Sequence, residues 1–381
     1  MITFAPLLGC KNLIKAIFMR RVDDKVLAQQ WCKQDDLPVW FSKTAWSLAT
    51  ISLWWEKSFL KKRPTIFVPG YFCNQSLWPL RKNDVNLIFY PVKDKLLPDW
   101  DACYELVKES KPDIFILTHF YGLISDVSGA KKFCDEHGAL FVEDAAHFML
   151  PVEKVGVESH FVLYSPHKFF PISQGALCII RPSVRKFVSA HQGRHVDFPT
   201  IRAQLGSGSY PFFKWLVRQT AKNITRDYLS RFKSYMPYEL DGANQPMPAK
   251  PYMSPWAKKL LSLELRNIPS YINHRKKCAQ LWEYLLVKKG VQMERVINST
   301  TDDIPYVAVF NSTYNEAPAI YKQLTQAKWP VSSWPDLPPE VRKNTELHAS
   351  TIHFRNNMII FPTNQSLKTS ELLKKYGGNI S

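Results

Sequence analysis

Short apolar runs alternate with amphipathic segments through the first half of the chain. The apolar runs predict strands over residues 65–68, 87–90, 114–118, 140–143 and 161–163. Hydrophobic residues at helical spacing predict helices over 74–81, 99–109 and 128–137. Apolar strands joined by helices are typical of a mostly parallel sheet that helices cover on both faces. Ligands of such sheets bind beyond the carboxyl ends of the strands.

The chain after residue 240 has a different pattern, which predicts a second, smaller domain. Residues 241–255 are rich in Pro and Gly and indicate a linker. Beyond it, the spacing of apolar residues predicts helices over 255–265, 272–286 and 317–327 and strands over 307–310 and 358–361. We therefore expect an N-terminal segment at 1–35, a large α/β domain at 36–245 and a small α+β domain at 246–381.

Residues 41–49 lead into a further predicted helix that continues through Trp55. Ser42 or Thr44 stands where an N-cap residue belongs. The free N–H groups and the dipole of a helix N-terminus also make it a natural seat for a phosphate group. Plain capping explains the same residues, so both interpretations stay open.

Composition and cysteine usage narrow the class of protein. With 381 residues, of which 45% are hydrophobic, the chain is globular and can bury a large core. No apolar run reaches the roughly 18 residues that span a bilayer, and residues 1–21 make a poor signal peptide. The seven cysteines form no CxxC motif, which argues against a disulfide framework and a zinc site. We expect a cytoplasmic protein.

The positive charge is concentrated in one stretch. The formal net charge is +17, and residues 181–233 hold 11 Lys and Arg against two Asp, so this stretch supplies +9. Lys214, Arg218, Lys222 and Arg226 recur every four residues, which places four cations along one helix face. Such a face is either a solvated helix side or a contact for an anionic substrate or membrane surface. We find no nucleic-acid-binding motif.

The candidate chemistry lies at two predicted strand ends. Asp144 follows the strand at 140–143, with His147 three residues later, and Lys168 follows the strand at 161–163 within Ser165-Pro-His167-Lys168. A pyridoxal phosphate enzyme needs this combination of an acid and a lysine. The acid keeps the pyridine nitrogen protonated, and the lysine holds the cofactor as a Schiff base and later moves protons. We therefore expect a pyridoxal phosphate site at this sheet edge.

Several motifs resemble one family over roughly residues 38–368. The family is that of the DegT/DnrJ/EryC1/StrS sugar aminotransferases, which have the fold-type-I architecture of aspartate aminotransferase. The similar segments are the acid motif Val142-Glu-Asp-Ala-Ala-His147, the turn Thr118-His-Phe-Tyr-Gly122, the phosphate loop Phe41-Ser-Lys-Thr-Ala45, and the tail segments Trp334-Pro-Asp-Leu-Pro338 and Phe361-Pro-Thr-Asn-Gln365. The resemblance implies a mostly parallel seven-stranded sheet in the large domain and a smaller α+β domain.

The resemblance also implies roles for individual residues. Lys168 would form the Schiff base, Asp144 would bind the pyridine nitrogen, and His147 would lie beside the ring's 3′ oxygen. The cofactor phosphate would be bound by residues of the helix start and of the lysine turn, which are Thr44, Ala45 and Ser165. An aromatic residue after Pro69-Gly70 would stack on the ring, and we choose Phe72 over Tyr71.

Three segments depart from the family pattern. Ser165 stands only three residues before Lys168, as in cysteine-desulfurase-type enzymes, in which the Ser and the intervening His, here His167, both face the phosphate. Lys43 occupies a phosphate-loop position where glycine is usual, so it either touches the phosphate or points to solvent. Lys250 replaces an Asn that reaches the partner subunit's cofactor in the family, and it is a candidate for the same contact across a dimer interface.

The expected function is transfer of an amino group from an amino acid, by analogy glutamate or glutamine, to a nucleotide-linked keto-sugar. Such a reaction would serve surface-polysaccharide or secondary-metabolite biosynthesis, in a homodimer with shared active sites. One alternative keeps the cofactor but performs a desulfurase or lyase reaction, for which Cys73 is a candidate. Another is a non-catalytic protein that binds anionic surfaces through residues 181–233.

Overall fold

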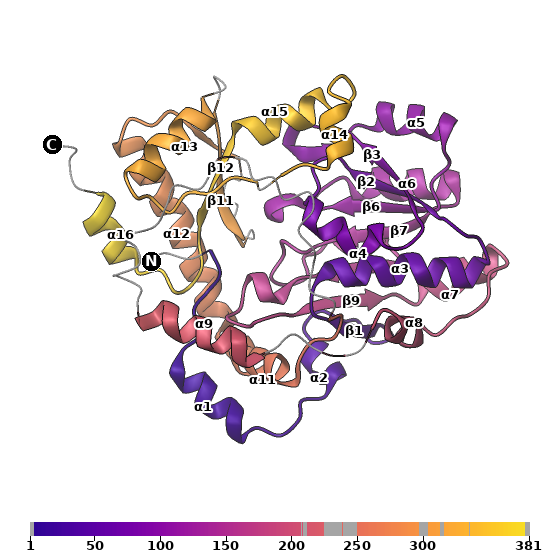
Figure 1. Cartoon of the computed structure of the whole chain (residues 1–381), viewed down its shortest axis with the longest axis horizontal. Coiled ribbons are helices and arrows are strands. Elements are labelled where there is room, and N and C mark those ends of the chain that lie inside the picture. Colours follow the sequence, from indigo (N-terminus) through magenta and orange to yellow (C-terminus); the bar gives the residue numbers. More distant parts are fainter. Residues whose placement is uncertain are drawn as a thin grey trace.

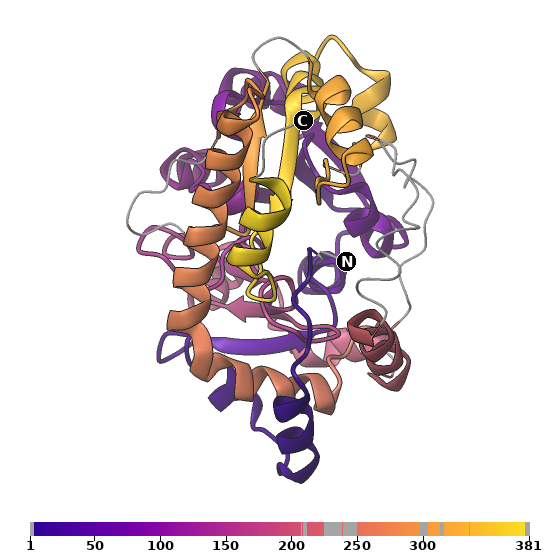
Figure 2. The same cartoon turned by 90° about the vertical axis from the view of Figure 1, so that its left-hand side faces the viewer.

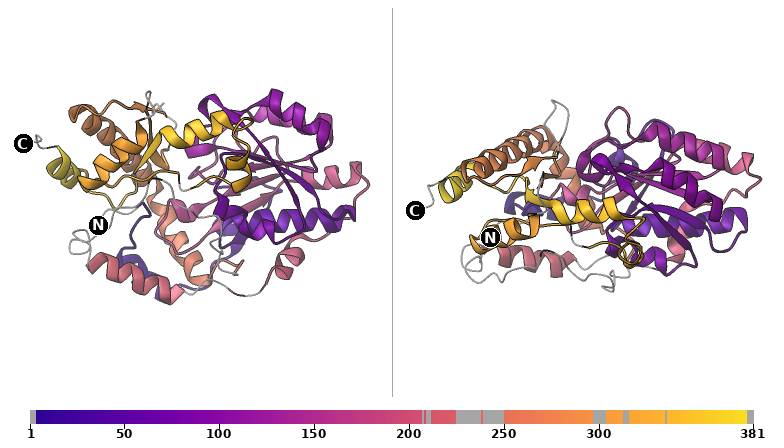
Figure 3. Two further views of the ribbon diagram at one scale, coloured as in Figure 1. Left: turned by 45° about the horizontal axis from the view of Figure 1, so that its top comes forward. Right: turned by 90° about the horizontal axis from the view of Figure 1, so that it is seen from above.

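A large sheet and a smaller one lie side by side in the computed structural model (Figures 1 and 3). The structure describes residues 4–206, 208, 212–224, 238, 250–296, 304–312, 316–334 and 336–377. Three predicted features lie outside this described part: much of the linker, the charged positions between 225 and 237, and the side chains of Arg218 and Lys222. Among the described helices, none combines the length and the apolar character needed to cross a bilayer.

The large sheet has seven strands in the order β1-β9-β8-β7-β6-β2-β3. The strands are β1 (Leu37–Phe41), β2 (Thr65–Pro69), β3 (Asn86–Tyr90), β6 (Ile114–Thr118), β7 (Leu140–Asp144), β8 (Phe161–Tyr164) and β9 (Ala176–Ile180). In this sheet β9 runs opposite to the other six strands, since it pairs antiparallel with both β1 and β8. The other strands therefore all end at the same edge, which confirms the mostly parallel seven-stranded sheet predicted from the sequence.

Alternate residues of the strands in the large sheet pack into two separate cores. Val39 and Phe41 of β1 enter the core on one face, and Trp40 between them enters the core on the other. Helices α3 (Thr44–Phe59), α4 (Trp78–Arg81), α5 (Trp100–Glu109), α6 (Val127–His137), α7 (Ser183–Ala190) and α8 (Phe198–Gln204) contribute to the first core. Helices α1 (Cys10–Phe18), α2 (Asp24–Ala28), α9 (Phe212–Ile224) and α11 (Pro255–Glu264) contribute to the second.

Short elements complete the large part of the molecule. They are η1 (Asn74–Leu77), η2 (Asp94–Leu96), η3 (Phe120–Gly122), η4 (Pro166–Lys168) and η5 (Leu265–Asn267), with the two-stranded sheet of β4 (Val92–Lys93) and β5 (Leu97–Pro98). The helix predicted over 74–81 is thus a 3₁₀ turn followed by one α-helical turn.

The smaller part contains an antiparallel sheet of β10 (Glu294–Arg295), β11 (Val307–Asn311) and β12 (Met358–Pro362). The 21-residue helix α12 (Ile268–Lys288) runs beside it, together with α13 (Ala317–Gln326) and α16 (Thr369–Tyr376) (Figure 2). Helices α14 (Pro339–Lys343) and α15 (Ala349–Asn357) lead back to the large part, where the Val92 N–H donates to Thr351 Oγ1 at 3.1 Å.

The predicted N-cap of α3 is wrong. The N-cap residue is Lys43, whose side chain makes no capping hydrogen bond, and Thr44 is the first helical residue. Ser42 is engaged elsewhere, because a distant segment passes the end of β1. Its hydroxyl donates to the Lys250 carbonyl at 2.6 Å, and its N–H donates to the Pro251 carbonyl at 2.7 Å. Within the residues that the structure describes, no side chain therefore caps the N-terminus of α3.

A buried arginine joins the two parts of the molecule. Arg275 of α12 is 1% exposed, and among the described residues no carboxylate pairs with it. Instead, its guanidinium donates to the carbonyls of Tyr306 at 3.1 Å and Phe169 at 3.2 Å, and to Gln365 Oε1 at 3.3 Å. Burial lowers the pKa of this guanidinium to about 10, so it remains charged at neutral pH. Phe169 directly follows Lys168, so Arg275 fixes the lysine turn against the smaller part.

We expect Arg275→Met to lower the free energy of unfolding by about 3 kcal/mol, because several buried carbonyls lose their donor. Urea denaturation of the purified protein measures this. Arg266 in η5 is exposed, so Arg266→Met is the matched control and should change stability by less than about 0.5 kcal/mol. Equal stability of the two variants would contradict the joining role of Arg275.

Candidate active site

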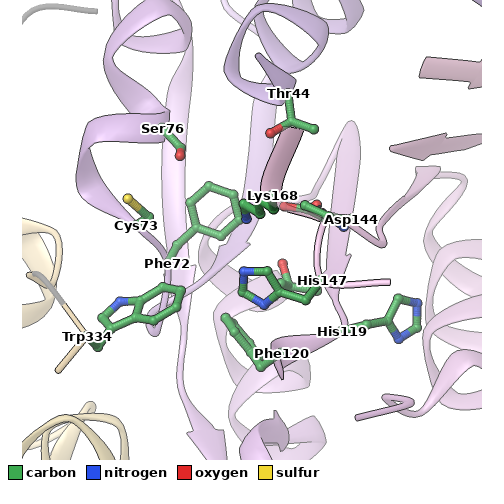
Figure 4. Close-up of a pocket in the computed structure, with 12 residues that line it drawn as sticks. Thr44, Phe72, Cys73, Ser76, His119, Phe120, Asp144, His147, Lys168 and Trp334 are labelled. Carbon is green, nitrogen blue, oxygen red and sulfur yellow. Dashed lines mark hydrogen bonds between the residues drawn. The ribbon is translucent and has the colours of Figure 1, made fainter. Parts of the chain in front are cut away.

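A cavity lies at the edge where β2, β6, β7 and β8 end. It is partly open to solvent, and the space between its walls is about 340 Å³. Its lining residues come from the strand ends and from the smaller part of the molecule; they are Thr44, Phe72, Cys73, Ser76, Thr118, His119, Phe120, Asp144, Ala146, His147, Lys168 and Trp334 (Figure 4). The sheet thus brings together residues that are far apart in the sequence.

Asp144, the last residue of β7, is 7% exposed. Its Oδ1 accepts a hydrogen bond from the Ala146 N–H at 3.0 Å, which orients the carboxyl group after the strand ends. Burial raises the pKa of this carboxyl group, while the Lys168 ammonium and the Ala146 N–H oppose the rise. A cation placed beside Asp144 would therefore favour its ionised form.

Lys168 ends the 3₁₀ turn η4, which begins directly after Ser165. Its N–H donates to the Ser165 carbonyl at 2.9 Å, and its side chain extends toward Asp144 and Phe72 (Figure 4). The Lys168 Nζ lies 5.4 Å from the centre of the Tyr306 ring. Burial lowers the pKa of this amine, and attraction to Asp144 opposes the decrease. The amine therefore loses its proton more readily than an exposed lysine does.

His147 is held between two tyrosine rings. It stacks on Tyr306 with a centroid distance of 4.7 Å and on Tyr121 at 5.7 Å. Its Nδ1 accepts the Tyr121 N–H at 2.8 Å, so the ring proton resides on Nε2. Burial, and secondly the charge of Lys168, lower the pKa of His147 well below its usual value. The imidazole is thus a neutral hydrogen-bond donor at neutral pH.

The turn after β6 presents this N–H group to His147. Tyr121 has a φ of +59°, a conformation that side-chain-bearing residues adopt at a cost, and Gly122 follows with a φ of +96°. Beneath the turn, His119 Nε2 donates to Glu143 Oε2 at 2.9 Å, and His119 Nδ1 accepts the Ser125 N–H at 3.0 Å. These buried bonds hold the strained turn in place.

Phe72 and Tyr71 occupy different surroundings. Phe72 lines the cavity beside Lys168, whereas Tyr71 bonds to the Tyr121 hydroxyl at 2.8 Å and stacks on Trp334 at 4.8 Å. Of this pair, Phe72 is therefore the residue available to a ligand, and Tyr71 supports the cavity wall from behind.

Of the residues predicted to face the cofactor phosphate, which are Thr44, Ala45, Ser165 and His167, only Thr44 lines the cavity. Ala45 is buried in the first turn of α3. The Ser165 hydroxyl is fully buried and has no hydrogen-bond partner among the described residues. His167 Nδ1 donates to the Gly175 carbonyl at 2.9 Å.

Lys250 does not line the cavity. Its carbonyl accepts the Ser42 hydroxyl, while its side chain is exposed. The contact of Lys250 with a partner subunit therefore stays a prediction.

Two aromatic residues of the cavity region had no predicted role. Tyr306, just before β11, contacts both Lys168 and His147. Trp334 belongs to the tail segment Trp334-Pro-Asp-Leu-Pro338, from which the sequence predicts no contact with the cavity. In the structure it forms part of the cavity wall (Figure 4). Both come from the smaller part of the molecule, and no pattern local to either residue indicates that contact.

Comparison with known proteins supports the fold. No protein-family model matches the chain, and no curated protein matches it by sequence. By structure, the chain is similar to Spr1654 of Streptococcus pneumoniae, which is assigned as a sugar aminotransferase and was solved in its PMP form. The TM-score is 0.68 at 13% sequence identity, and the match covers 99% of this chain and 98% of that one.

Two further solved structures have the same architecture. PseC of Helicobacter pylori, an aminotransferase of pseudoaminic acid biosynthesis, has a TM-score of 0.66 at 13% identity over 98% of this chain and 99% of its own. A DegT DnrJ EryC1 StrS aminotransferase from Brucella abortus has a TM-score of 0.61 at 12% identity, covering 97% and 90%. These likenesses confirm the predicted fold-type-I architecture.

The thiol of Cys73 provides a test of the site's electrostatics. Burial raises the pKa of Cys73 even though its side chain lines the cavity. We therefore expect iodoacetamide at pH 8 to alkylate the exposed Cys10 and to leave Cys73 largely unmodified, because the thiolate is the reactive form. Peptide mass spectrometry measures both sites. Alkylation of Cys73 as fast as Cys10 would show that its thiol is activated.

Proposed function

We propose that this chain is a pyridoxal-phosphate-dependent aminotransferase that transfers an amino group from an amino acid to a keto-sugar. The observation that carries the proposal is the meeting of Asp144 and Lys168 in one cavity at the carboxyl edge of the sheet. Support for the sugar substrate comes from two proteins of the same fold, Spr1654, which is assigned as a sugar aminotransferase, and PseC, an aminotransferase of pseudoaminic acid biosynthesis. The amino donor, by analogy, is glutamate or glutamine.

The residues around the cavity fit pyridoxal phosphate. Ser165 Oγ and Thr118 Oγ1 are buried polar atoms without partners among the described residues, as expected of groups that await a ligand. The uncapped start of α3 offers N–H groups at Thr44 and Ala45 for a phosphate. Phe72 offers an apolar face for the ring, and Asp144 would bind the ring nitrogen. When bound, the cofactor supplies an electron sink for the carbon that loses a proton.

Lys168 has two roles in this proposal. It would hold the cofactor through its amine, and, once a substrate amine has replaced it, it would carry a proton to and from the substrate carbon. Its lowered pKa suits the second role, because a base must be unprotonated near neutral pH to accept a proton. Tyr306 and Asp144 restrict where the amine can lie.

Asp144 and His147 would tune the bound cofactor. A protonated ring nitrogen beside Asp144 would favour the carboxylate that burial alone disfavours. His147 would donate its Nε2–H to the ring's 3′ oxygen, since Nδ1 is already occupied by the Tyr121 N–H. The two stacked tyrosines keep the imidazole from rotating away.

The proposed enzyme is a homodimer in the cytoplasm, with Lys250 reaching toward the partner's site. Its reaction would serve surface-polysaccharide or secondary-metabolite biosynthesis. The alternative desulfurase or lyase chemistry is less well supported, because the thiol of Cys73 is protonated. The other alternative is non-catalytic binding of anionic surfaces through residues 181–233, of which Lys214 in α9 is exposed.

The first test is the absorbance spectrum. We expect the purified protein to acquire a visible band with pyridoxal phosphate, and glutamate to convert it to the spectrum of the amine form. Lys168→Ala should abolish the covalent band. The control is Lys154→Ala, at an exposed lysine outside the cavity, which should retain it. A protein that stays colourless with the cofactor would overturn the proposal.

The second test concerns Asp144. We expect Asp144→Asn to keep the cofactor band, because Lys168 remains, but to slow the half-reaction with glutamate by roughly 10²–10³-fold, since a preorganised charge is lost. Stopped-flow absorbance measures the rate. An unchanged rate would mean that Asp144 does not contact the ring nitrogen.

A further inference from the structure

Lys43 is a half-buried cation without a counter-charge. It lies between the end of β1 and the start of α3, and among the described residues no carboxylate forms an ion pair with it. A partly buried ammonium is costly unless an anion compensates it. The position therefore calls for a negatively charged group that is not part of the described chain.

The neighbours of Lys43 increase the positive character of this region. Burial, and then repulsion by Lys168, lower the pKa of Lys43 to about 8. Lys43 in turn helps burial to lower the pKa of His167. The charge of Lys168 thus disfavours the charge of Lys43, and the two amines make this region electropositive.

Backbone bonds fix this arrangement. The Gly175 N–H donates to the Ser42 carbonyl at 3.0 Å, and the Gly175 carbonyl accepts both the N–H and the Nδ1–H of His167. Gly175 thus holds both the residue before Lys43 and the turn that carries Lys168. The N-terminus of α3 and the Ser165 hydroxyl also lie in this region, and within the described part of the chain neither has a side-chain partner. All these groups favour an anion with several oxygen atoms.

We propose that the Lys43 ammonium binds the phosphate of pyridoxal phosphate and makes the site selective for the phosphorylated cofactor over pyridoxal. This inference rests on the proposed function. A phosphate dianion beside Lys43 would remove its repulsion with Lys168 as well as compensate its buried charge. The phosphate would therefore stabilise the site twice, through a direct contact and through the relief of repulsion.

The test compares the affinities of pyridoxal phosphate and pyridoxal, measured by absorbance titration of the purified protein. Both compounds react with Lys168 through the same aldehyde. A change in the ratio of their affinities between variants therefore reports on the phosphate. We expect Lys43→Met to reduce the ratio about 10- to 100-fold, the range of a lost charged hydrogen bond. Lys43→Arg should keep most of the selectivity, which also shows that the position tolerates replacement. Lys154→Met is the control and should leave the ratio unchanged.

The pH dependence gives a second, independent readout. Above about pH 8 the free Lys43 loses its proton, whereas the cofactor phosphate remains a dianion. The selectivity of the original protein should therefore fall as the pH rises through this range, and that of Lys43→Met should stay flat. Lys168 acts on both compounds alike, and His167 is neutral throughout this range, so neither distorts the ratio.

The outcomes separate the two proposals. If the protein binds pyridoxal phosphate at Lys168 but Lys43→Met retains the full ratio, Lys43 does not bind the phosphate and this inference is wrong while the proposed function stands. If the original protein binds neither compound, the proposed function fails and this inference fails with it. A ratio that falls in Lys43→Met but not in Lys43→Arg supports both.

Discussion

The buried guanidinium of Arg275 connects the lysine turn of the large part with Tyr306 of the smaller part. Through the Phe169 carbonyl it holds the residue next to Lys168, and through the Tyr306 carbonyl it holds the ring that stacks on His147. Its described partners are neutral oxygen atoms rather than a carboxylate. The N–H groups of the guanidinium therefore donate to several of them at once. The lysine, which comes from the large part, and the tyrosine, which comes from the smaller part, are therefore positioned by one side chain.

The electrostatics of the cavity indicate a site prepared for a ligand with charges of both signs. Burial disfavours the charged forms of Asp144, Lys168 and His147 together. A ligand with a cationic ring nitrogen near Asp144 and an anionic group near the start of α3 would offset these costs. The chain has assembled the groups in advance, so binding need not reorganise them. The same argument explains why a strained residue, Tyr121, is retained beside His147.

The sequence allowed the large sheet and the central pair of residues to be predicted, because both are encoded locally. Apolar runs mark the strands; Asp144 ends one of them, and Lys168 lies in the short turn that follows the next. The N-cap of α3 could not be predicted, since Ser42 is occupied by a segment more than 200 positions away. Tyr306 and Arg275 were missed for the same reason: their roles exist only after the smaller part packs against the lysine turn. Local patterns specify elements, whereas these contacts depend on the complete fold.

The reversed strand β9 has a consequence for how this chain can vary. Because β9 is antiparallel to β8, the chain leaves the sheet after Tyr164 and re-enters it at the same edge at Ala176. The intervening loop is closed by the bonds between His167 and Gly175, and Lys168 lies inside it. Helical crossovers elsewhere in the sheet can lengthen at the surface without disturbing the cavity. This loop cannot, because an inserted residue would break its closure and move the lysine. In this chain, an insertion between Tyr164 and Ala176 should therefore disturb Lys168 more than an insertion of equal length in an outer connection.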